Sequence, residues 1–332
     1  MASESKKTVL VAAAANFTLA VAKAIGGIIG GSAALLAEAA HSVADTTDQG
    51  FLLLSLRLGE RPPDEDHPFG YGKQRFFWSF LAAVFIFVSG GLFSIGQGVV
   101  EMVGGESGGS FLVSYVVLVV AALAEGVSWL RALRQLRSEA RESDVPLRRY
   151  VRESKDPTVK TVMLEDSGAL VGVALAAIGV GMHQLTGQSW WDGAASVAIG
   201  LLLCYIGVGL GRYTQGLLLG EAATEDDRRK LRRVIEKRDE VVDVKQLMTM
   251  VLGPGNLLVA VRLDLADGIP SERVEALATE IDREMREAVP SVKQVFLDPT
   301  PEHGEGDPAS GGDSSTIGER GEETRRFRSR AG

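Results

Sequence analysis

Cysteine is almost absent from this sequence, because Cys204 is the only one in the chain. One cysteine excludes an intramolecular disulfide framework and any metal or redox site built from paired cysteines. We expect Cys204 to be a small apolar residue in a helix. An excess of basic charge is also missing, since the formal net charge is -8, and this argues against a general nucleic-acid-binding protein. Lys6 and Lys7 precede an apolar run longer than that of a cleavable signal peptide, so we expect the first helix to be retained.

Long apolar runs fill the first two-thirds of the chain, and the charges gather in the loops and after residue 212. A helix needs about 20 apolar residues to cross a bilayer. No charge interrupts the sequence from Phe76 to Val100, whereas only glycines and Ser32 separate the first two runs, which predicts a tight hairpin. The predicted spans lie near residues 8–30, 31–58, 76–103, 110–133, 160–185 and 190–212.

Basic residues are distributed unequally among the loops between these spans. The connections at 104–109 and 184–191 contain no lysine or arginine, whereas those at 58–75 and 131–155 contain several. Positively charged loops stay on the cytoplasmic side of a membrane. We therefore expect an integral, multi-pass membrane protein with both termini in the cytoplasm, located in the cell (plasma) membrane.

The sequence from Thr224 onward has the pattern of a small soluble domain. Thr224 followed by three acidic residues is typical of a helix start. The segment 253–256, Gly-Pro-Gly-Asn, is typical of a turn between two strands. From Leu257 to Leu265 apolar residues alternate with polar ones, as in a strand with one buried face. The predicted order is a helix at 224–237, strands at 244–252 and 257–265, a helix at 271–288 and a strand at 292–297.

The expected fold is therefore an all-α six-helix transmembrane bundle followed by a small α+β domain of order αββαβ, of the ferredoxin-like kind. Residues from Thr300 onward are mainly Gly, Ser, Glu, Asp and Arg, a composition typical of disorder. The predicted divisions are a cytoplasmic N-terminus at 1–7, a transmembrane domain at 8–212, a cytoplasmic domain at 213–300 and a disordered tail at 301–332.

The second apolar run contains four ionisable residues, Glu38, His41, Asp45 and Asp48. At about 100° per residue they fall within one narrow arc of a helix, called the stripe below. A bare charge at mid-bilayer costs roughly 2.5–3.5 kcal/mol. Such a stripe persists where it lines a cavity, pairs across helices or binds a cation. His41 and Asp45 are four residues apart, close enough to share one metal ion.

Glu165 and Asp166 begin a long uncharged stretch in the fifth run. Two acids near a helix start could simply be favoured by the helix dipole. Taken with the stripe, however, Asp166 could join His41 and Asp45 on one divalent ion. Glu165 or water would be the fourth ligand. One imidazole with carboxylates suits zinc and tolerates iron, cobalt or manganese.

These motifs resemble a known family. The pattern Ala37-Glu38, then His41-Ser42-x-x-Asp45, is similar to the second span of the cation diffusion facilitator transporters, and the loop at 61–73 (RPPDEDHPFGYGK) resembles the loop that follows it. The triplet at 164–166 (LED) resembles the branch that includes the zinc transporter 9 group. The likeness covers residues 8–300. It implies a homodimer, formed through the transmembrane and cytoplasmic domains, that exports divalent metal from the cytoplasm in exchange for protons.

Three departures from the family pattern affect the metal sites. Val162 stands four residues before Asp166, where the family usually has His or Asp, so Glu165 would have to substitute as the fourth ligand. Neighbouring residues of a helix point about 100° apart, so this requires a distorted helix.

In the loop, Asp64 and His67 match a peripheral metal site of the family, but Tyr71 replaces its usual third histidine. We expect a weak site there or none. No histidine lies between residues 184 and 302, so we predict no binuclear zinc site in the cytoplasmic domain, which would serve dimerisation.

Other polar residues in the spans have simpler expected roles. Asp48 and Glu38 are candidates for metal access or proton relay. Lys23 and Glu125 are expected to form an ion pair that helps the bundle to pack. His183, near the end of the fifth span, is expected to be interfacial.

Three other functions stay open. The stripe could serve a proton-coupled transporter of another cation, or the chain could be a metal-sensing or scaffolding membrane protein that does not transport. An intramembrane hydrolase is disfavoured because the sequence has no nucleophile elbow and no HExxH pattern, although a metal-bound water alone could suffice. We expect no tightly bound cofactor. The transported ion is expected to be Zn²⁺, with Fe²⁺, Co²⁺ and Mn²⁺ as alternatives.

Overall fold

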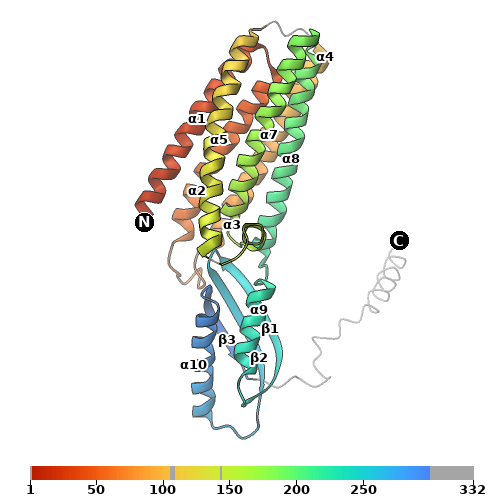
Figure 1. Ribbon diagram of the computed structural model, residues 1–332. Coiled ribbons are helices and arrows are strands. Elements are labelled where there is room, and N and C mark those ends of the chain that lie inside the picture. Colours follow the sequence, from red (N-terminus) through yellow and green to blue (C-terminus); the bar gives the residue numbers. More distant parts are fainter. Residues whose placement is uncertain (1, 105–108, 143, 300–332) are drawn as a thin grey trace, which may run out of the picture.

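The computed structural model describes residues 2–104, 109–142 and 144–299. It shows a bundle of long helices with a small α/β domain at one end (Figure 1). That end is called the domain end below, and the opposite one the far end. The tail predicted at 301–332 lies outside the described residues.

Six long helical segments form the bundle in the described part of the chain. They are α1 (Ala2–Gly30), α2 (Ala33–Gly59), the stretch of α3 (Gln74–Phe85), η1 (Ile86–Leu92) and α4 (Phe93–Gly104), then α5 (Phe111–Glu142), α7 (Pro157–Thr186) and α8 (Trp190–Leu219), with the short α6 (Leu147–Glu153) before α7. Of the six long segments, all except α2 are long and apolar enough to cross a membrane. The 27 residues of α2 are long enough to span a bilayer, but this helix carries the stripe.

A tight hairpin joins α1 to α2, as predicted. Gly31 and Ser32 alone separate the two helices. Gly31 has a φ of 60°, a left-handed conformation that glycine adopts without strain. The Ser32 hydroxyl then accepts a hydrogen bond from the backbone N–H of Leu35 at 3.1 Å and so caps α2.

Helix α5 is longer than predicted, because it continues past residue 133 to Glu142. Its buried side chains continue into this extension at Leu133 and Leu136, and the charged residues lie on the other faces. The hydroxyl of Tyr150, in α6, donates a hydrogen bond to Glu139 at 3.1 Å. The basic segment predicted as a connection at 131–155 is therefore largely helical, and its α6 contacts the end of α5.

The third span contains a π-helical segment, η1, that the sequence did not predict. This span packs against α8 through glycines that bring the two backbones together. A β-carbon on Gly98 would lie 2.5 Å from the carbonyl oxygen of Gly193, and one on Gly200 would lie 2.7 Å from that of Gly91. Small residues allow membrane helices to approach this closely.

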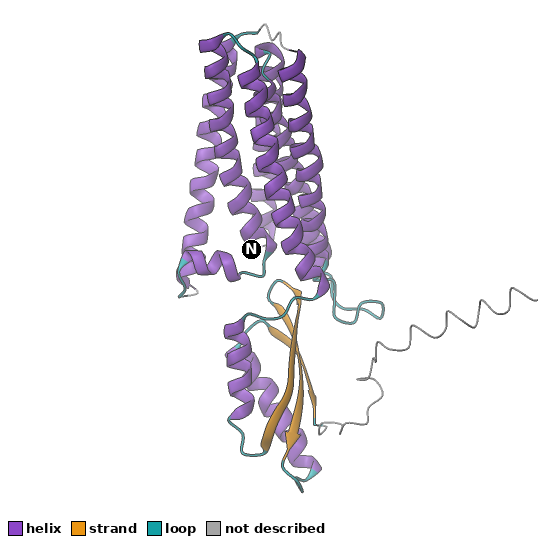
Figure 2. Cartoon of the chain, turned by 90° about the vertical axis from the view of Figure 1, so that its right-hand side faces the viewer, coloured by secondary structure: helices purple, strands orange, loops and turns teal. Residues whose placement is uncertain are grey.

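The small domain has the predicted order αββαβ. Its elements are α9 (Glu225–Glu236), β1 (Val241–Gly253), β2 (Asn256–Leu265), α10 (Ser271–Ala288) and β3 (Val292–Asp298). The sheet order is β1-β2-β3, with β2 antiparallel to β1 and parallel to β3. The Thr224 hydroxyl accepts a hydrogen bond from the N–H of Asp227, which confirms the predicted helix start. Leu231, Val259 and Ile281 belong to the core that packs the helices onto the sheet, and Figure 2 shows the helices beside the strands.

The loop between α2 and α3 contacts this domain. The Lys73 ammonium lies 3.9 Å from Met250 Sδ of β1 and donates a hydrogen bond to the Leu218 carbonyl at the end of α8, and the rings of Phe69 and Phe296 meet edge to face. A β-carbon on Gly72 would lie 2.6 Å from the Leu252 carbonyl oxygen. The loop that resembles the family motif therefore lies between the bundle and the sheet.

Candidate functional site

The stripe lies on α2 and is buried inside the bundle. Glu38 is fully buried, His41 is 2% exposed, and Asp45 and Asp48 are each 8% exposed. The His41 Nε2 atom lies 3.4 Å from Asp45 Oδ1, as the four-residue spacing predicted. An imidazole and a carboxylate are thus held side by side in the interior.

Glu38 belongs to a buried ion network. The Lys23 ammonium, from α1, lies 3.0 Å from Glu38 Oε2 and 3.2 Å from Glu125 Oε1 of α5, and it donates a hydrogen bond to the Ser42 hydroxyl at 2.9 Å. The predicted pair of Lys23 and Glu125 is confirmed. Sequence reasoning missed that Glu38 and Ser42 bind the same ammonium. Their spacing of four residues on α2 was the available signal.

The two acids of α7 point in different directions. Glu165 is 7% exposed and lies near enough to Asp48 and Asp45 on α2 to interact with their charges. Asp166 faces α5 and accepts a hydrogen bond from the Ser128 hydroxyl at 3.4 Å. Helix α7 is continuous from Pro157 to Thr186, so its neighbouring side chains stay about 100° apart.

Glycines allow α7 to approach the stripe. A β-carbon on Gly172 would overlap Glu38 Oε1, and one on Gly168 would lie 3.8 Å from His41 Cε1. Two small residues one turn apart therefore place the α7 backbone directly over the ionisable face of α2.

Several buried polar atoms in this region have no hydrogen-bond partner among the described residues. They are Glu38 Oε1, His41 Nδ1, Asp45 Oδ1 and Glu165 Oε1. Buried polar atoms in native proteins are nearly always paired, so each such atom calls for a ligand, a water or a movement of the helices. Three of the four residues are the imidazole and carboxylates predicted to hold the metal.

The described residues do not bring three metal-ligating side chains together at one point. His41 and Asp45 are adjacent. On α7, Glu165 lies near enough to Asp45 and Asp48 to interact with their charges, whereas Asp166, which is bonded to Ser128, lies near enough to interact with Asp45 and His41. The four-ligand set therefore stays a prediction that would require a local movement of α7.

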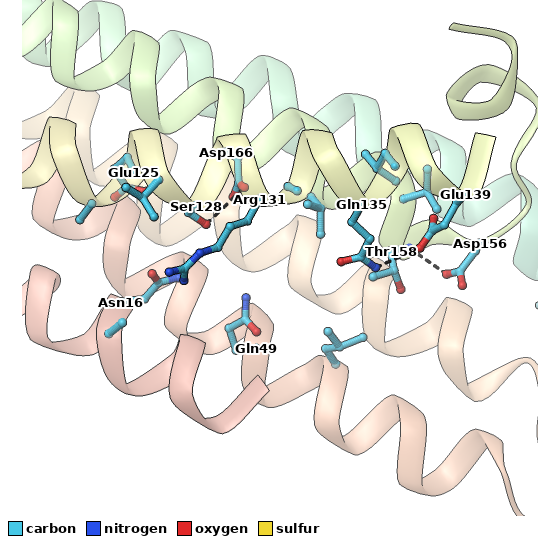
Figure 3. Close-up of a pocket in the computed structure, with 18 of the residues that line it drawn as sticks. Asn16, Gln49, Glu125, Ser128, Arg131, Gln135, Glu139, Asp156, Thr158 and Asp166 are labelled. Atoms are coloured by element: carbon cyan, nitrogen blue, oxygen red, sulfur yellow. Dashed lines mark hydrogen bonds between the residues drawn. The ribbon is translucent and has the colours of Figure 1, made fainter. Parts of the chain in front are cut away.

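A cavity of about 1060 Å³ extends from Glu125 and Asp166 to Asp156 at the domain end. It lies between α1, α2, α5 and α7. Asp166, Glu125 and Val162 line its inner part. Figure 3 shows Arg131 extending from α5 across the cavity toward Asn16 of α1. Asp166 is thus the predicted ligand that a cation entering by this cavity could reach.

The loop site has a different structure from the metal site that it resembles. The Tyr71 hydroxyl donates a hydrogen bond to Asp64 Oδ2 at 2.7 Å, and His67 donates its backbone N–H to Asp64 Oδ1 at 2.7 Å. The Tyr71 hydrogen bond, helped by that of His67, holds the pKa of Asp64 below its usual range. Both carboxylate oxygens of Asp64 are therefore already engaged, which supports the expectation of a weak site or none.

His183 is buried, and its ring meets that of Phe111 edge to face at 5.2 Å. It packs between helices α5 and α7. Cys204 is half-buried on α8, opposite Gly91.

Comparison with known proteins agrees with this architecture. Residues 9–219 match the family described as the cation efflux transmembrane domain. The chain is 31% identical over 258 residues to the mitochondrial proton-coupled zinc antiporter SLC30A9 of Homo sapiens, a match that covers 78% of this chain and 45% of that protein. It is 29% identical over 311 residues to metal tolerance protein C4 of Arabidopsis thaliana, covering 80% of this chain and 68% of that one.

A bacterial relative matches along almost its whole length. The chain is 25% identical over 308 residues to the manganese efflux system protein MneP of Bacillus subtilis, covering 91% of this chain and 99% of that protein. The chain spans about half the length of the mitochondrial antiporters that it matches.

Proposed function

The chain belongs to the cation efflux family, and from that premise we propose that it exports a divalent metal cation across a membrane in exchange for protons. The observation that carries this proposal is the buried face between α2 and α7. There an imidazole and two carboxylates, from His41, Asp45 and Glu165, present polar atoms that have no hydrogen-bond partner in the described part of the chain.

Proton coupling would follow from the chemistry of these ligands. A histidine binds metal only when it is neutral, and a carboxylate only when it is ionised. Protons and metal therefore compete for the same residues. Asp166 at the end of the cavity would take part as the cation arrives, and Asp48, which lines a separate small pocket, would serve metal access or proton relay.

Zinc is the first candidate for the transported ion, because one imidazole with carboxylates forms a tetrahedral set that suits it. Manganese is the second candidate, since a set rich in oxygen atoms also suits Mn²⁺ and one relative is a manganese efflux protein. Fe²⁺ and Co²⁺ fit the same ligand types.

The orientation and assembly are also proposals. The basic residues at the domain end favour placing both termini in the cytoplasm, so metal would enter by the cavity and leave at the far end. A homodimer is supported by exposed apolar residues on the small domain, where Met248 is 50% and Phe296 52% exposed.

Metal flux into sealed vesicles tests the function. The purified chain is reconstituted with a pH gradient, and Zn²⁺, Mn²⁺, Fe²⁺ and Co²⁺ are compared. We expect saturable flux of one metal that depends on the gradient and falls at least about tenfold in D45A and in D166A, because each variant removes a ligand. D267A, in an exposed loop, is the matched control.

Binding without flux of any metal would contradict export and favour a metal-sensing or scaffolding protein. Flux that persists in both D45A and D166A would show that the ion uses other residues.

A further inference from the structure

A buried acid at the far end is not used by the proposed transport site. Asp192, in the first turn of α8, is fully buried. Its Oδ1 accepts a hydrogen bond from the Ser32 hydroxyl at 2.8 Å, and its Oδ2 accepts one from the backbone N–H of Ala34 at 3.2 Å. These three groups are called the far-end latch below.

The latch joins α8 to the first turn of α2. The first N–H groups of a helix have no partners within the helix, and a carboxylate is stabilised at that positive end. Ser32 caps the N–H of Leu35 from within its own helix segment, whereas Asp192 caps the N–H of Ala34 from another helix. Both oxygens of this buried charge are bonded, as burial of a charge requires. The latch therefore fixes the helix that carries the stripe.

The two ends of the bundle differ in access. At the domain end, the cavity reaches Asp166, and Ser128 and Gln135 on its wall are exposed. At the far end, the latch ties α2 to α8, and Gly109 packs against the carbonyl of Gly30 in the α1–α2 corner. Among the described residues, a separation of α2 from α8 at the far end would break both bonds of the latch.

We propose that Asp192 is a positioning residue whose bonds to α2 keep the site facing the domain-end cavity, and that these bonds break when the site opens toward the far end. The proposal rests on the transport function proposed above. Weakening the latch shifts the population of the chain away from the cavity-open conformation.

Access to the cavity can be measured with a single thiol, because Cys204 is the only cysteine. In a C204S background, Q135C places a reporter on the cavity wall. The chain is held in nanodiscs, where both faces meet solvent, and labelled with a polar maleimide. We expect D192N to slow labelling at least about threefold, because the cavity-open population falls, and S32A to slow it less.

The control for these variants is Q184A. It removes an exposed hydrogen bond between Tyr115 and Gln184, of 2.8 Å, which joins α5 to α7 near the same end. We expect Q184A to label at the wild-type rate.

If D192N is labelled at the wild-type rate but exchanges its amide hydrogens faster at residues 32–37, then Asp192 only caps the start of α2. That result would overturn the latch. If D192N does not fold, S32A decides, because it keeps the bond between Asp192 and the Ala34 N–H. The labelling rate can be measured without any transport, so the experiment can contradict the latch proposal and the transport proposal independently of each other. Metal flux without a labelling shift overturns the latch alone, and a shift without flux in the wild type overturns only the transport function.

Discussion

A tyrosine stands at position 71, where the family's loop usually has a histidine, and it bonds the carboxylate that would hold a metal. The rings of Tyr71 and His67 lie 4.2 Å apart, and the Tyr71 hydroxyl donates to Asp64. The sequence predicted that a ligand was missing. It could not predict that Asp64 is occupied, because that depends on the path of the loop rather than on the identity of one residue.

Restoring the histidine should restore the site. We expect Y71H to bind one additional Zn²⁺ per chain, because Asp64 and His67 are already beside position 71. Binding should weaken as the pH falls below about 6.5, where imidazoles take up protons. Isothermal titration calorimetry of Y71H against the wild type measures this.

Y71F is the matched control, because it frees Asp64 without adding a ligand, and it should bind no additional ion. An equal stoichiometry in Y71H and Y71F would contradict the prediction.

At the scale of elements, the stripe depends on how closely α7 approaches α2. The order and type of the predicted elements are confirmed, since apolar run length, Thr224 and the Gly-Pro-Gly-Asn turn are local signals. Three other features could not be predicted from the sequence, and the reason is physical. The length of α5, the π-helical η1 and the contact between Gly172 and Glu38 all depend on neighbouring helices that a local pattern does not contain.

Gly172 gives this element-scale contact a test. A methyl group in G172A would overlap Glu38, so we expect a loss of about 1–3 kcal/mol in the free energy of unfolding, as for overpacked cores. In G181A the new carbon would meet only the Tyr115 hydroxyl, at 3.6 Å. That control should be neutral or more stable by about 0.5–1 kcal/mol, because alanine is the better helix former.

Denaturant unfolding in detergent compares the two variants. A wild-type unfolding midpoint for G172A would show that α7 does not rest on Glu38.

At the scale of the whole molecule, one ammonium holds three helices together. Lys23 of α1 binds Glu38 and Ser42 of α2 and Glu125 of α5. The sequence predicted one of these bonds, because Lys23 and Glu125 were intramembrane charges of opposite sign. The metal-ligand set stays a prediction: His41, Asp45 and Glu165 are buried, and Asp166 is partly buried. The directions in which these side chains point depend on how α2, α5 and α7 pack against one another.

Removal of this ammonium should destabilise the whole bundle. In K23M two carboxylates stay buried without a counter-charge, and we expect a loss of about 3–5 kcal/mol in the free energy of unfolding. E125Q should cost less, because Glu38 and Ser42 still hold the ammonium.

Thermal unfolding in detergent measures the difference, with K237M, at an exposed lysine of the small domain, as the control. Equal midpoints for K23M and K237M would refute a structural role for the network.

The π-helical segment η1 has a consequence for any scan of the third span. A π-turn takes in one more residue than an α-turn, so positions after Leu92 are rotated by about 100° from where an unbroken α-helix starting at Gln74 would place them. The side chains before η1 and those after it therefore follow two different angular registers around the helix axis. A helical-wheel projection that starts at Phe76 therefore places Gly98 and the residues around it on the wrong face of the helix. A substitution series across this span should assign helix faces anew from Phe93.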